Sequence, residues 1–209
     1  LSAISHDLRT PLAALVGLAD TLKLTNPAAK DDEKEIIDAI RHSAMRMNDL
    51  VNNLLDMARL ESGTVQLNRQ WQPLEEVIGS ALSSCAALLE ERPINIHLDE
   101  NLPLLNIDAV LIERVLVNIL ENASKYTPPH SSIEINGFLQ NENVIVTIDD
   151  HGAGLPAGRE NAIFEKFERG NKENATPGVG LGLAISRAIM KAHGGFIHGE
   201  TRYNGGARF

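Results

Sequence analysis

Cysteine, positive charge and long hydrophobic runs are scarce in this sequence, and each shortage excludes a class of protein. Cys85 is the only cysteine among 209 residues, so the chain cannot form an internal disulfide and fits a reducing compartment. The net charge of −9 argues against a nucleic-acid surface, which needs clustered Lys and Arg. No apolar run approaches the roughly 18–20 residues that cross a bilayer, and no signal-peptide pattern is present. We therefore expect a soluble globular protein of one large or two small domains.

Two amphipathic helices are predicted in the first 64 residues. Apolar side chains of the first recur at steps of three and four, and so share one face: Leu1, Ile4, Leu8, Leu12, Leu15, Ala19 and Leu22. The second has the same spacing at Ile36, Ile40, Ala44, Met47, Val51, Leu54 and Ala58. Pro27 breaks the pattern between them, because proline biases the preceding residue away from helical angles. We predict an antiparallel helical hairpin over residues 1–64.

This hairpin has more apolar surface than its two helices can bury against each other. Leu50, Leu55 and Met57 widen the apolar stripe of the second helix. The excess can be covered by a second copy of the chain, giving a four-helix bundle, or by the remainder of the same chain. We favour the dimer.

Residues 65–209 alternate between strand and helix patterns. Strands are predicted at 65–68, 94–98, 132–138 and 144–148, with a final hairpin that pairs 195–199 with 207–209. Helices are predicted at 74–91, at 108–125 and from about 181. Strands paired in hairpins with interspersed helices indicate an α+β fold and not a doubly wound parallel sheet.

The segment Ser5–Leu12 places a histidine beside a carboxylate on the first predicted helix. His6 lies away from the apolar face, next to Asp7 and one turn before Thr10, and Pro11 loosens the turn that carries it. A histidine in such a position is usually an ordinary surface residue. Its neighbours make His6 a candidate nucleophile, for which the rest of the chain must supply an electrophile.

Two polar clusters follow in residues 65–209. Asn118, Asn122 and Lys125 share one face of a predicted helix, where amide oxygens beside a polyphosphate can complete a Mg²⁺ site. Asp150 follows an apolar strand and can accept a hydrogen bond from an adenine amino group. Taken alone, the first cluster is better explained as a solvated polar stripe near a helix end, and the second is a weak signal because a strand–Asp–Gly turn is also a common structural corner.

Glycines form the remaining pattern. Gly152 and Gly154 follow Asp150 and allow the backbone to approach a planar ligand closely. Gly178, Gly180 and Gly182 precede a helical pattern, and the free amides of a helix N-terminus bind anions. The spacing is neither a dinucleotide fingerprint nor a Walker motif.

In this order and downstream of His6, the clusters resemble the sensor histidine kinases of two-component signalling, over essentially the whole chain. The matching segments are Ser5–Leu12 (phosphoacceptor box), Asn118–Tyr126 (N box), Asp150–Gly154 (G1 box), Phe164–Arg169 (F box) and Gly178–Leu183 (G2 box). Segments 63–70, 74–82 and 169–183 are most similar to the potassium-responsive members of the family.

The resemblance implies a dimeric phosphotransfer hairpin at 1–64 and an ATP-binding α/β sandwich of the Hsp90, gyrase and MutL type at 65–209. It implies ATP and Mg²⁺ as cofactors, with Asn122 as the metal ligand and Asn118 supporting it. Lys125 would contact phosphate, Tyr126 would line the pocket and Asp150 would read adenine. The other residues that it places at the nucleotide are Gly152, Gly154, Phe167, Arg169, Gly178, Gly180, Leu181 and Gly182.

The implied activity is autophosphorylation, in which a ring nitrogen of His6 attacks the γ-phosphoryl group while Asp7 holds the other nitrogen. The phosphoryl group would pass to an aspartate in the receiver domain of a response regulator. Thr10 would orient water for the reverse, phosphatase reaction. We expect the chain to be the cytoplasmic portion of an inner-membrane sensor, touching the membrane only through regions outside it, and responding to potassium or osmotic stress.

Two other functions stay open. A conformational ATPase of the Hsp90 or MutL type would use the same pocket with a catalytic acid near Glu121, but does not need the pair His6 and Asp7. A non-catalytic dimerisation scaffold would tolerate broken nucleotide clusters, whereas all of them are intact here.

Overall fold

The computed structural model describes residues 13–22, 24, 31–61, 66–166, 168 and 180–209. The chain divides into two compact units, Leu1–Thr64 and Val65–Phe209, and each is described by itself. Some residues of the predicted site lie outside the described ranges: His6, Asp7, Thr10, Phe167, Arg169 and Gly178. No helix in the described ranges combines the length and apolar composition that crossing a membrane requires.

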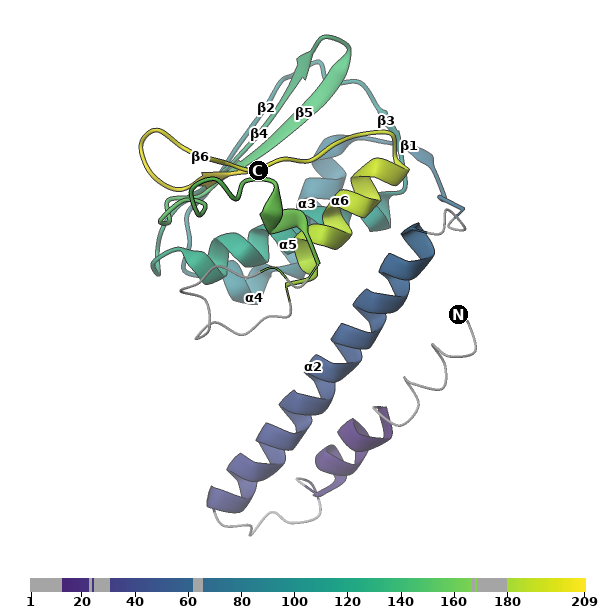
Figure 1. Cartoon of the computed structure of the whole chain (residues 1–209), viewed down its shortest axis with the longest axis vertical. Helices are drawn as coiled ribbons and strands as arrows, with labels where there is room; N and C mark the ends of the chain where they lie inside the picture. Colours follow the sequence, from purple (N-terminus) through teal and green to yellow (C-terminus); the bar gives the residue numbers. More distant parts are fainter. Residues whose placement is uncertain (1–12, 23, 25–30, 62–65, 167, 169–179) are drawn as a thin grey trace. The chain divides into compact units, whose positions relative to one another are not determined.

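The first unit is a helical hairpin (Figure 1). Residues 13–22 and 24 are helical, and α2 (Asp31–Glu61) runs beside them. Arg41 of α2 donates from Nε to Asp20 Oδ1 at 2.8 Å, and Ala19 and Ala44 are buried. Small residues at these positions let the two helices approach closely, and the hairpin prediction is confirmed.

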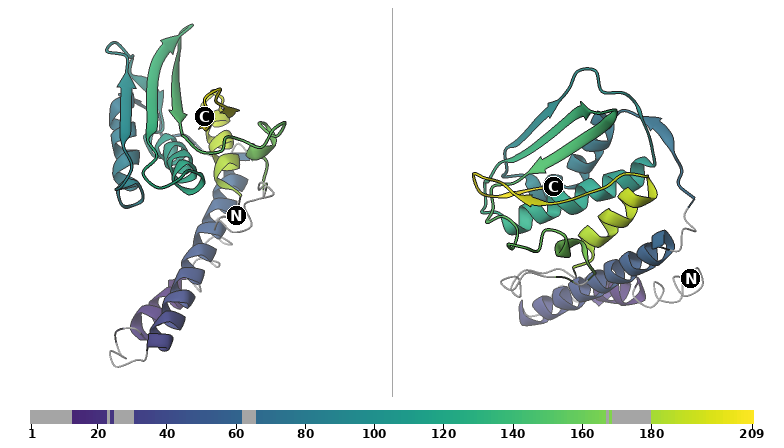
Figure 2. Two further views of the ribbon diagram at one scale, coloured as in Figure 1. Left: turned by 90° about the vertical axis from the view of Figure 1, so that its left-hand side faces the viewer. Right: turned by 45° about the horizontal axis from the view of Figure 1, so that its top comes forward.

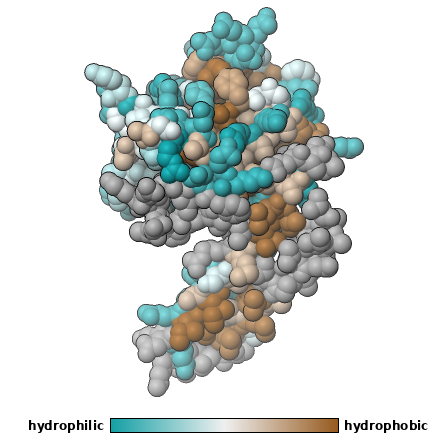
Figure 3. Space-filling model, viewed as in Figure 1, coloured by the Kyte–Doolittle hydropathy of each residue, from teal (hydrophilic) through white to brown (hydrophobic). Residues whose placement is uncertain are grey.

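A broad apolar surface of the hairpin stays exposed in the single chain. Eight large apolar side chains are between 40% and 62% exposed: Leu15, Leu18, Leu22, Ile36, Ile40, Met45, Met47 and Leu54. Figure 3 shows hydrophobic side chains gathered on the hairpin. The apolar stripe predicted for α2 therefore lies largely outside the contact between the two helices. Ile37 is buried, whereas the predicted Ile36 is exposed.

The second unit is a five-stranded mixed sheet with helices on one face (Figure 2). The strand order is β2 (Ile94–Leu98), β4 (Ile133–Gln140), β5 (Asn143–Asp149), β7 (Ala207–Arg208) and β6 (Glu200–Thr201). β2 and β4 are parallel and the other neighbours are antiparallel. The covering helices are α3 (Leu74–Ser84), α4 (Ala86–Leu89), α5 (Ala109–Tyr126) and α6 (Gly182–Ala192). The remaining elements are a two-stranded sheet of β1 (Gln70–Gln72) and β3 (Leu105–Ile107), and the single turn η1 (Ala162–Phe164).

The core of this unit follows from the two periodicities of the sequence. Side chains of β4 alternate between faces, so Ile133 and Ile135 are buried against the helices. α5 presents a stripe of buried residues to them: Val115, Leu116, Ile119, Leu120 and Ala123. Asp108 begins α5 by accepting a hydrogen bond from the Leu111 amide at 3.3 Å. The predicted α+β sandwich is confirmed.

Three local predictions differ from the structure. The helix expected at 74–91 is interrupted at Cys85, which has non-helical angles. Residues 66–68 are not a strand, because the Asn68 amide donates to Asp108 Oδ2 at 3.0 Å instead of entering a ladder. The last hairpin pairs β6 with β7, and the expected strand at 195–199 is irregular. Gly195 and Gly199 weaken that segment as a strand.

Candidate functional site

The first predicted cluster lies on α5, where Asn118 contacts the beginning of α6. Asn118 Nδ2 donates to the Gly182 carbonyl at 3.1 Å and to Ser186 Oγ at 3.2 Å. Ser186 Oγ donates to the same carbonyl at 3.0 Å, and Ser186 is fully buried. The amide of Asn118 therefore holds the N-terminus of α6 against α5.

Asn122 follows one turn later on the same face and is half-buried. Among the residues that the structure describes, none hydrogen-bonds to its side chain, and no side-chain nitrogen or oxygen is buried without a partner. Its amide oxygen is a hard ligand of the kind that Mg²⁺ takes. Asn122 is thus the member of the cluster that is available to a metal ion.

Lys125 and Tyr126 end α5. Lys125 Nζ lies 2.9 Å from Glu121 Oε2, an i,i+4 pair on the helix surface. Such an exposed pair contributes only about 0.3–0.5 kcal/mol, so an incoming phosphate can redirect the ammonium at little cost. The Tyr126 side chain is exposed.

Asp150 is nearly buried, and its carboxylate is fixed by the backbone around it. Oδ1 accepts from the Gly152 amide at 2.8 Å and from the Ala207 amide at 2.9 Å. The Asp150 amide donates to the Ala207 carbonyl, and Arg202 Nη1 donates to the Asp150 carbonyl, both at 2.9 Å. Within the described ranges Oδ2 has no partner, which leaves one oxygen for a ligand.

Glycines permit the backbone to close around this carboxylate. A Cβ on Gly152 would lie 2.7 Å from the Tyr126 carbonyl oxygen, and one on Gly206 would lie 1.9 Å from that of Asp150. Gly206 and Gly154 also have positive φ, of 87° and 78°. No other residue fits these positions without moving the backbone. The G1 turn is therefore packed directly on the end of α5.

The beginning of α6 supplies the described part of the G2 cluster. Gly180 has a φ of 72°, Leu181 is buried at the N-cap position, and Gly182 is the first helical residue. The first amides of a helix have no partner within the helix and point outward. Together with the Asn118 contact, this places the N-terminus of α6, a type of terminus that can bind anions, beside Asn118 on α5.

The F box (Phe164–Arg169) packs through Phe164 against the C-terminal residue and α6. Phe164 is buried edge-on against Phe209, with ring centroids 6.4 Å apart and an interplanar angle of 79°. The Arg187 guanidinium lies 6.0 Å from the Phe164 ring centroid, and Arg187 Nη2 lies 2.8 Å from Glu165 Oε1. These contacts attach the segment to α6.

The structure assigns different partners to the two adjacent aspartates. Asp149 is 1% exposed and receives two hydrogen bonds from Arg208, from Nε at 2.7 Å and from Nη2 at 2.6 Å. This hydrogen bonding raises the pKa of Arg208. Asp149 thus joins β5 to β7, while the carboxylate of Asp150 is held by backbone amides.

Sequence reasoning missed Arg202 and Arg208, which hold this aspartate pair. Their only local signal is their position in the closing hairpin, which does not connect them to residues more than fifty positions earlier. His151 turns toward β4, with Nδ1 3.1 Å from the Ser132 carbonyl oxygen and Nε2 3.6 Å from Glu134 Oε1.

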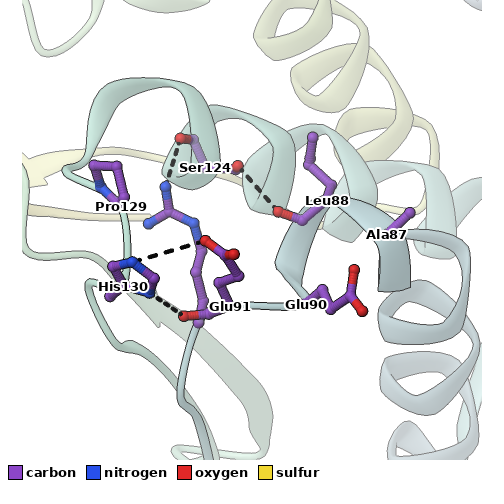
Figure 4. Close-up of a pocket in the computed structure, with 8 residues that line it drawn as sticks. Ala87, Leu88, Glu90, Glu91, Ser124, Pro129 and His130 are labelled. Carbon is purple, nitrogen blue, oxygen red and sulfur yellow. Dashed lines mark hydrogen bonds and ion pairs between the residues drawn. The ribbon is translucent and has the colours of Figure 1, made fainter.

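A separate shallow hollow of about 300 Å³ lies beyond the end of α5 (Figure 4). It is lined by Ala87, Leu88, Glu90, Glu91, Arg92, Ser124, Pro129 and His130. No predicted site residue lines it. In the described ranges, no three His, Cys, Asp or Glu side chains gather as a metal site would require.

Two family models match the chain. Residues 1–63 match the His Kinase A (phospho-acceptor) domain, and residues 107–209 match the histidine kinase-, DNA gyrase B-, and HSP90-like ATPase. The chain belongs to the histidine kinase family. The resemblance identified from the sequence motifs is confirmed.

Histidine kinases with similar sequences include the sensor protein KdpD of several bacteria. The chain is 49% identical over its full length to KdpD of Escherichia coli and 35% identical to KdpD of Clostridium acetobutylicum. It covers 23% and 24% of those proteins, and so spans about a quarter of the length of these relatives. The predicted similarity to sensor kinases of the KdpD type is confirmed at the level of sequence.

Solved structures of histidine kinases share the fold. Full-length ShkA in complex with AMPPNP superposes with a TM-score of 0.85 at 26% identity, covering 100% of this chain and 44% of that one. The histidine kinase AdeS of Acinetobacter baumannii gives a TM-score of 0.62 at 22% identity, covering 97% and 94%.

Proposed function

We propose that the chain is the catalytic core of a sensor histidine kinase, in which ATP bound in Val65–Phe209 phosphorylates His6 in Leu1–Thr64. The observation that carries this proposal is the Asp150 carboxylate. Oδ1 accepts hydrogen bonds from two backbone amides, and among the described residues Oδ2 has no partner, so it is left for a ligand. The match of residues 1–63 to a phospho-acceptor domain supports His6 as the recipient.

In this proposal the adenine amino group donates to Asp150 Oδ2, and the phosphates lie between α5 and the start of α6. Asn118 supports this arrangement through its bonds to α6, and Lys125 contacts phosphate. The other residues that we assign to the nucleotide are Tyr126, Gly152, Gly154, Phe167, Arg169, Gly178, Gly180, Leu181 and Gly182.

Asn122 is the proposed Mg²⁺ ligand. Its free amide oxygen fits a cation that prefers oxygen and keeps several of its waters when it binds beside phosphates. A bound Mg²⁺ would offset the charge that develops on the transferring phosphoryl group.

At the other unit, a ring nitrogen of His6 bonds to the γ-phosphorus as the bond to the bridging oxygen breaks, and ADP leaves. Asp7 accepts a hydrogen bond from the N–H of the other ring nitrogen, which fixes the tautomer and stabilises the cation formed on attack. The phosphoryl group then passes to an aspartate of a response-regulator receiver domain. Thr10 orients water for dephosphorylation of that regulator.

We further propose that the hairpin dimerises, because its exposed large apolar residues form a surface that a second copy can cover. By analogy with the KdpD relatives, the chain would be the cytoplasmic part of a membrane sensor for potassium or osmotic stress.

Labelling with γ-labelled ATP and Mg²⁺ tests the proposal. We expect phosphate on the protein that is labile to acid and stable to base, and we expect His6→Gln to lose it while still binding nucleotide. Label that persists in His6→Gln would refute the assignment.

Asn122→Ala tests the metal site, with Asn95→Ala on the exposed part of β2 as its control. We expect only Asn122→Ala to weaken the binding of Mg·ATP. Unchanged affinity would remove Asn122 from the metal site.

A further inference from the structure

Arg92, in the turn between α4 and β2, makes four hydrogen bonds to the end of α5. Nη1 donates to Thr127 Oγ1 at 2.5 Å and to the Pro128 carbonyl at 3.1 Å. Nη2 donates to the carbonyls of Ser124 at 2.9 Å and Thr127 at 3.3 Å. No motif in the sequence pointed to this residue.

These contacts complete the C-terminus of α5. The last carbonyls of a helix have no partner within the helix, and a cation there also interacts favourably with the helix dipole. Thr127 Oγ1 donates to the Ala123 carbonyl at 2.6 Å, and Arg92 donates to the carbonyls of Ser124 in the last turn and Thr127 just after it. The planar fork of a guanidinium can meet several acceptors at once, whereas an ammonium is a single point of charge.

The end of α5, which Arg92 holds, also carries residues that we assign to the proposed nucleotide site. Asn122 lies in the penultimate turn of α5, and Lys125 and Tyr126 are its final residues. A Cβ on Gly152 would lie 2.7 Å from the Tyr126 carbonyl oxygen and 3.1 Å from Thr127 Cγ2. The turn that follows Asp150 therefore rests on the backbone that Arg92 fixes.

We propose that Arg92 is a positioning residue for the nucleotide: it holds the end of α5 so that the α5 side chains and the Asp150 turn keep the spacing that the nucleotide needs. It acts through Thr127 and the Ser124–Pro128 backbone and touches no reacting atom. This inference rests on the proposed function, because it assumes that ATP binds between α5 and the Asp150 turn.

The test compares Arg92→Lys with Arg69→Lys in the full chain. Arg69 is a matched control because its Nη2 donates at 3.0 Å to the Ala192 carbonyl, at the end of α6 and away from the proposed pocket. We measure the Kd for AMPPNP with Mg²⁺, the KM and kcat for labelling by γ-labelled ATP, and the thermal midpoint. Loss of folded protein lowers kcat and leaves KM unchanged, whereas a displaced site raises KM.

We expect Arg92→Lys to raise Kd and KM about tenfold, as the loss of hydrogen bonds from a charged donor would, and Arg69→Lys to leave both unchanged. Thr127→Val, which removes the Oγ1 acceptor, provides a second variant and should raise Kd in the same direction. Wild-type Kd in Arg92→Lys, or an equal rise in Arg69→Lys, would overturn the inference.

The outcome for the wild-type chain separates this inference from the proposed function. Nucleotide binding without label on His6 would refute the kinase assignment while the comparison of Kd values still decides the role of Arg92. A wild-type chain that binds no nucleotide would refute both.

Discussion

Replacing Asp150 by asparagine should separate its role in binding from its role in folding. Asp150 Oδ1 accepts two backbone hydrogen bonds, at 2.8 and 2.9 Å, and Oδ2 has no partner in the part of the chain that the structure describes. In Asp150→Asn, the side-chain oxygen must take the place of Oδ1 and accept from the two backbone N–H groups. An NH₂ group in that place would set donor against donor. The NH₂ group therefore replaces Oδ2 and meets the adenine amino group as a second donor.

The magnitude follows from these contacts. Losing a hydrogen bond to a charged acceptor costs about 1.5–3 kcal/mol, which weakens ATP binding by roughly 10- to 150-fold. The free energy of unfolding should change little, because both backbone bonds remain. Asp150→Ala is different: it leaves two buried amides without an acceptor and should lower the free energy of unfolding by about 2–6 kcal/mol.

The assay is competitive binding of ATP and GTP to the wild-type chain and to Asp150→Asn, with urea unfolding as the stability measurement. Guanine carries an oxygen acceptor where adenine carries its amino donor. Asp150→Asn should therefore lose affinity for ATP but not for GTP, which reduces the preference between them. Equal losses for both nucleotides, or wild-type affinity for ATP, would refute the reasoning.

Three further predictions concern the supports of the site. Gly152→Ala should lower both nucleotide affinity and the free energy of unfolding, the latter by about 1–3 kcal/mol, because its Cβ would lie 2.7 Å from a backbone oxygen; calorimetry and urea unfolding measure the two. Arg208→Met should cost near the low end of about 3–5 kcal/mol in urea unfolding, since Asp149 stays buried and keeps only the longer contact of 3.7 Å from Arg202 Nε to Oδ2; no loss would show that Arg202 or water replaces Arg208. Burial, with added repulsion from Glu121 and Glu113, raises the pKa of the Cys85 thiol, so its alkylation should be slow until urea unfolds the chain.

The same shift of Cys85 sets the sign of a pH effect. Its pKa is higher in the folded chain than in the unfolded chain, so the unfolded thiol ionises first as pH rises. The Cys85 contribution should therefore lower stability above about pH 9, and Cys85→Ala should reduce this dependence in urea unfolding followed against pH.

Elements with a strong local period were predictable from the sequence. α5 and the hairpin of β4 and β5 appear where helical and alternating patterns indicate them, because burial on one face fixes both pattern and structure. The break at Cys85 was not predictable, since the apolar pattern continues through it. The buried face of the α2 helix was assigned to Ile36, whereas the structure buries Ile37.

The ligand-facing side chains were easier to find than the residues that hold them. Asn122 and Asp150 belong to short motifs whose chemistry is visible in the sequence. The arginines that hold the neighbouring residues are distant in the sequence: Arg92 is 35 positions from Thr127, and Arg208 is 59 from Asp149. Such pairs come together only when the chain has folded, so they leave no periodic pattern in the sequence.

The central claim is that the γ-phosphoryl group of ATP is transferred to His6. The most direct test is peptide mapping by mass spectrometry at neutral pH, after incubation of the full chain with Mg·ATP. The account predicts a phosphoryl group on the imidazole of His6. Release of inorganic phosphate with no phosphorylated protein, as a conformational ATPase would give, or a phosphoryl group on any other residue, would contradict it.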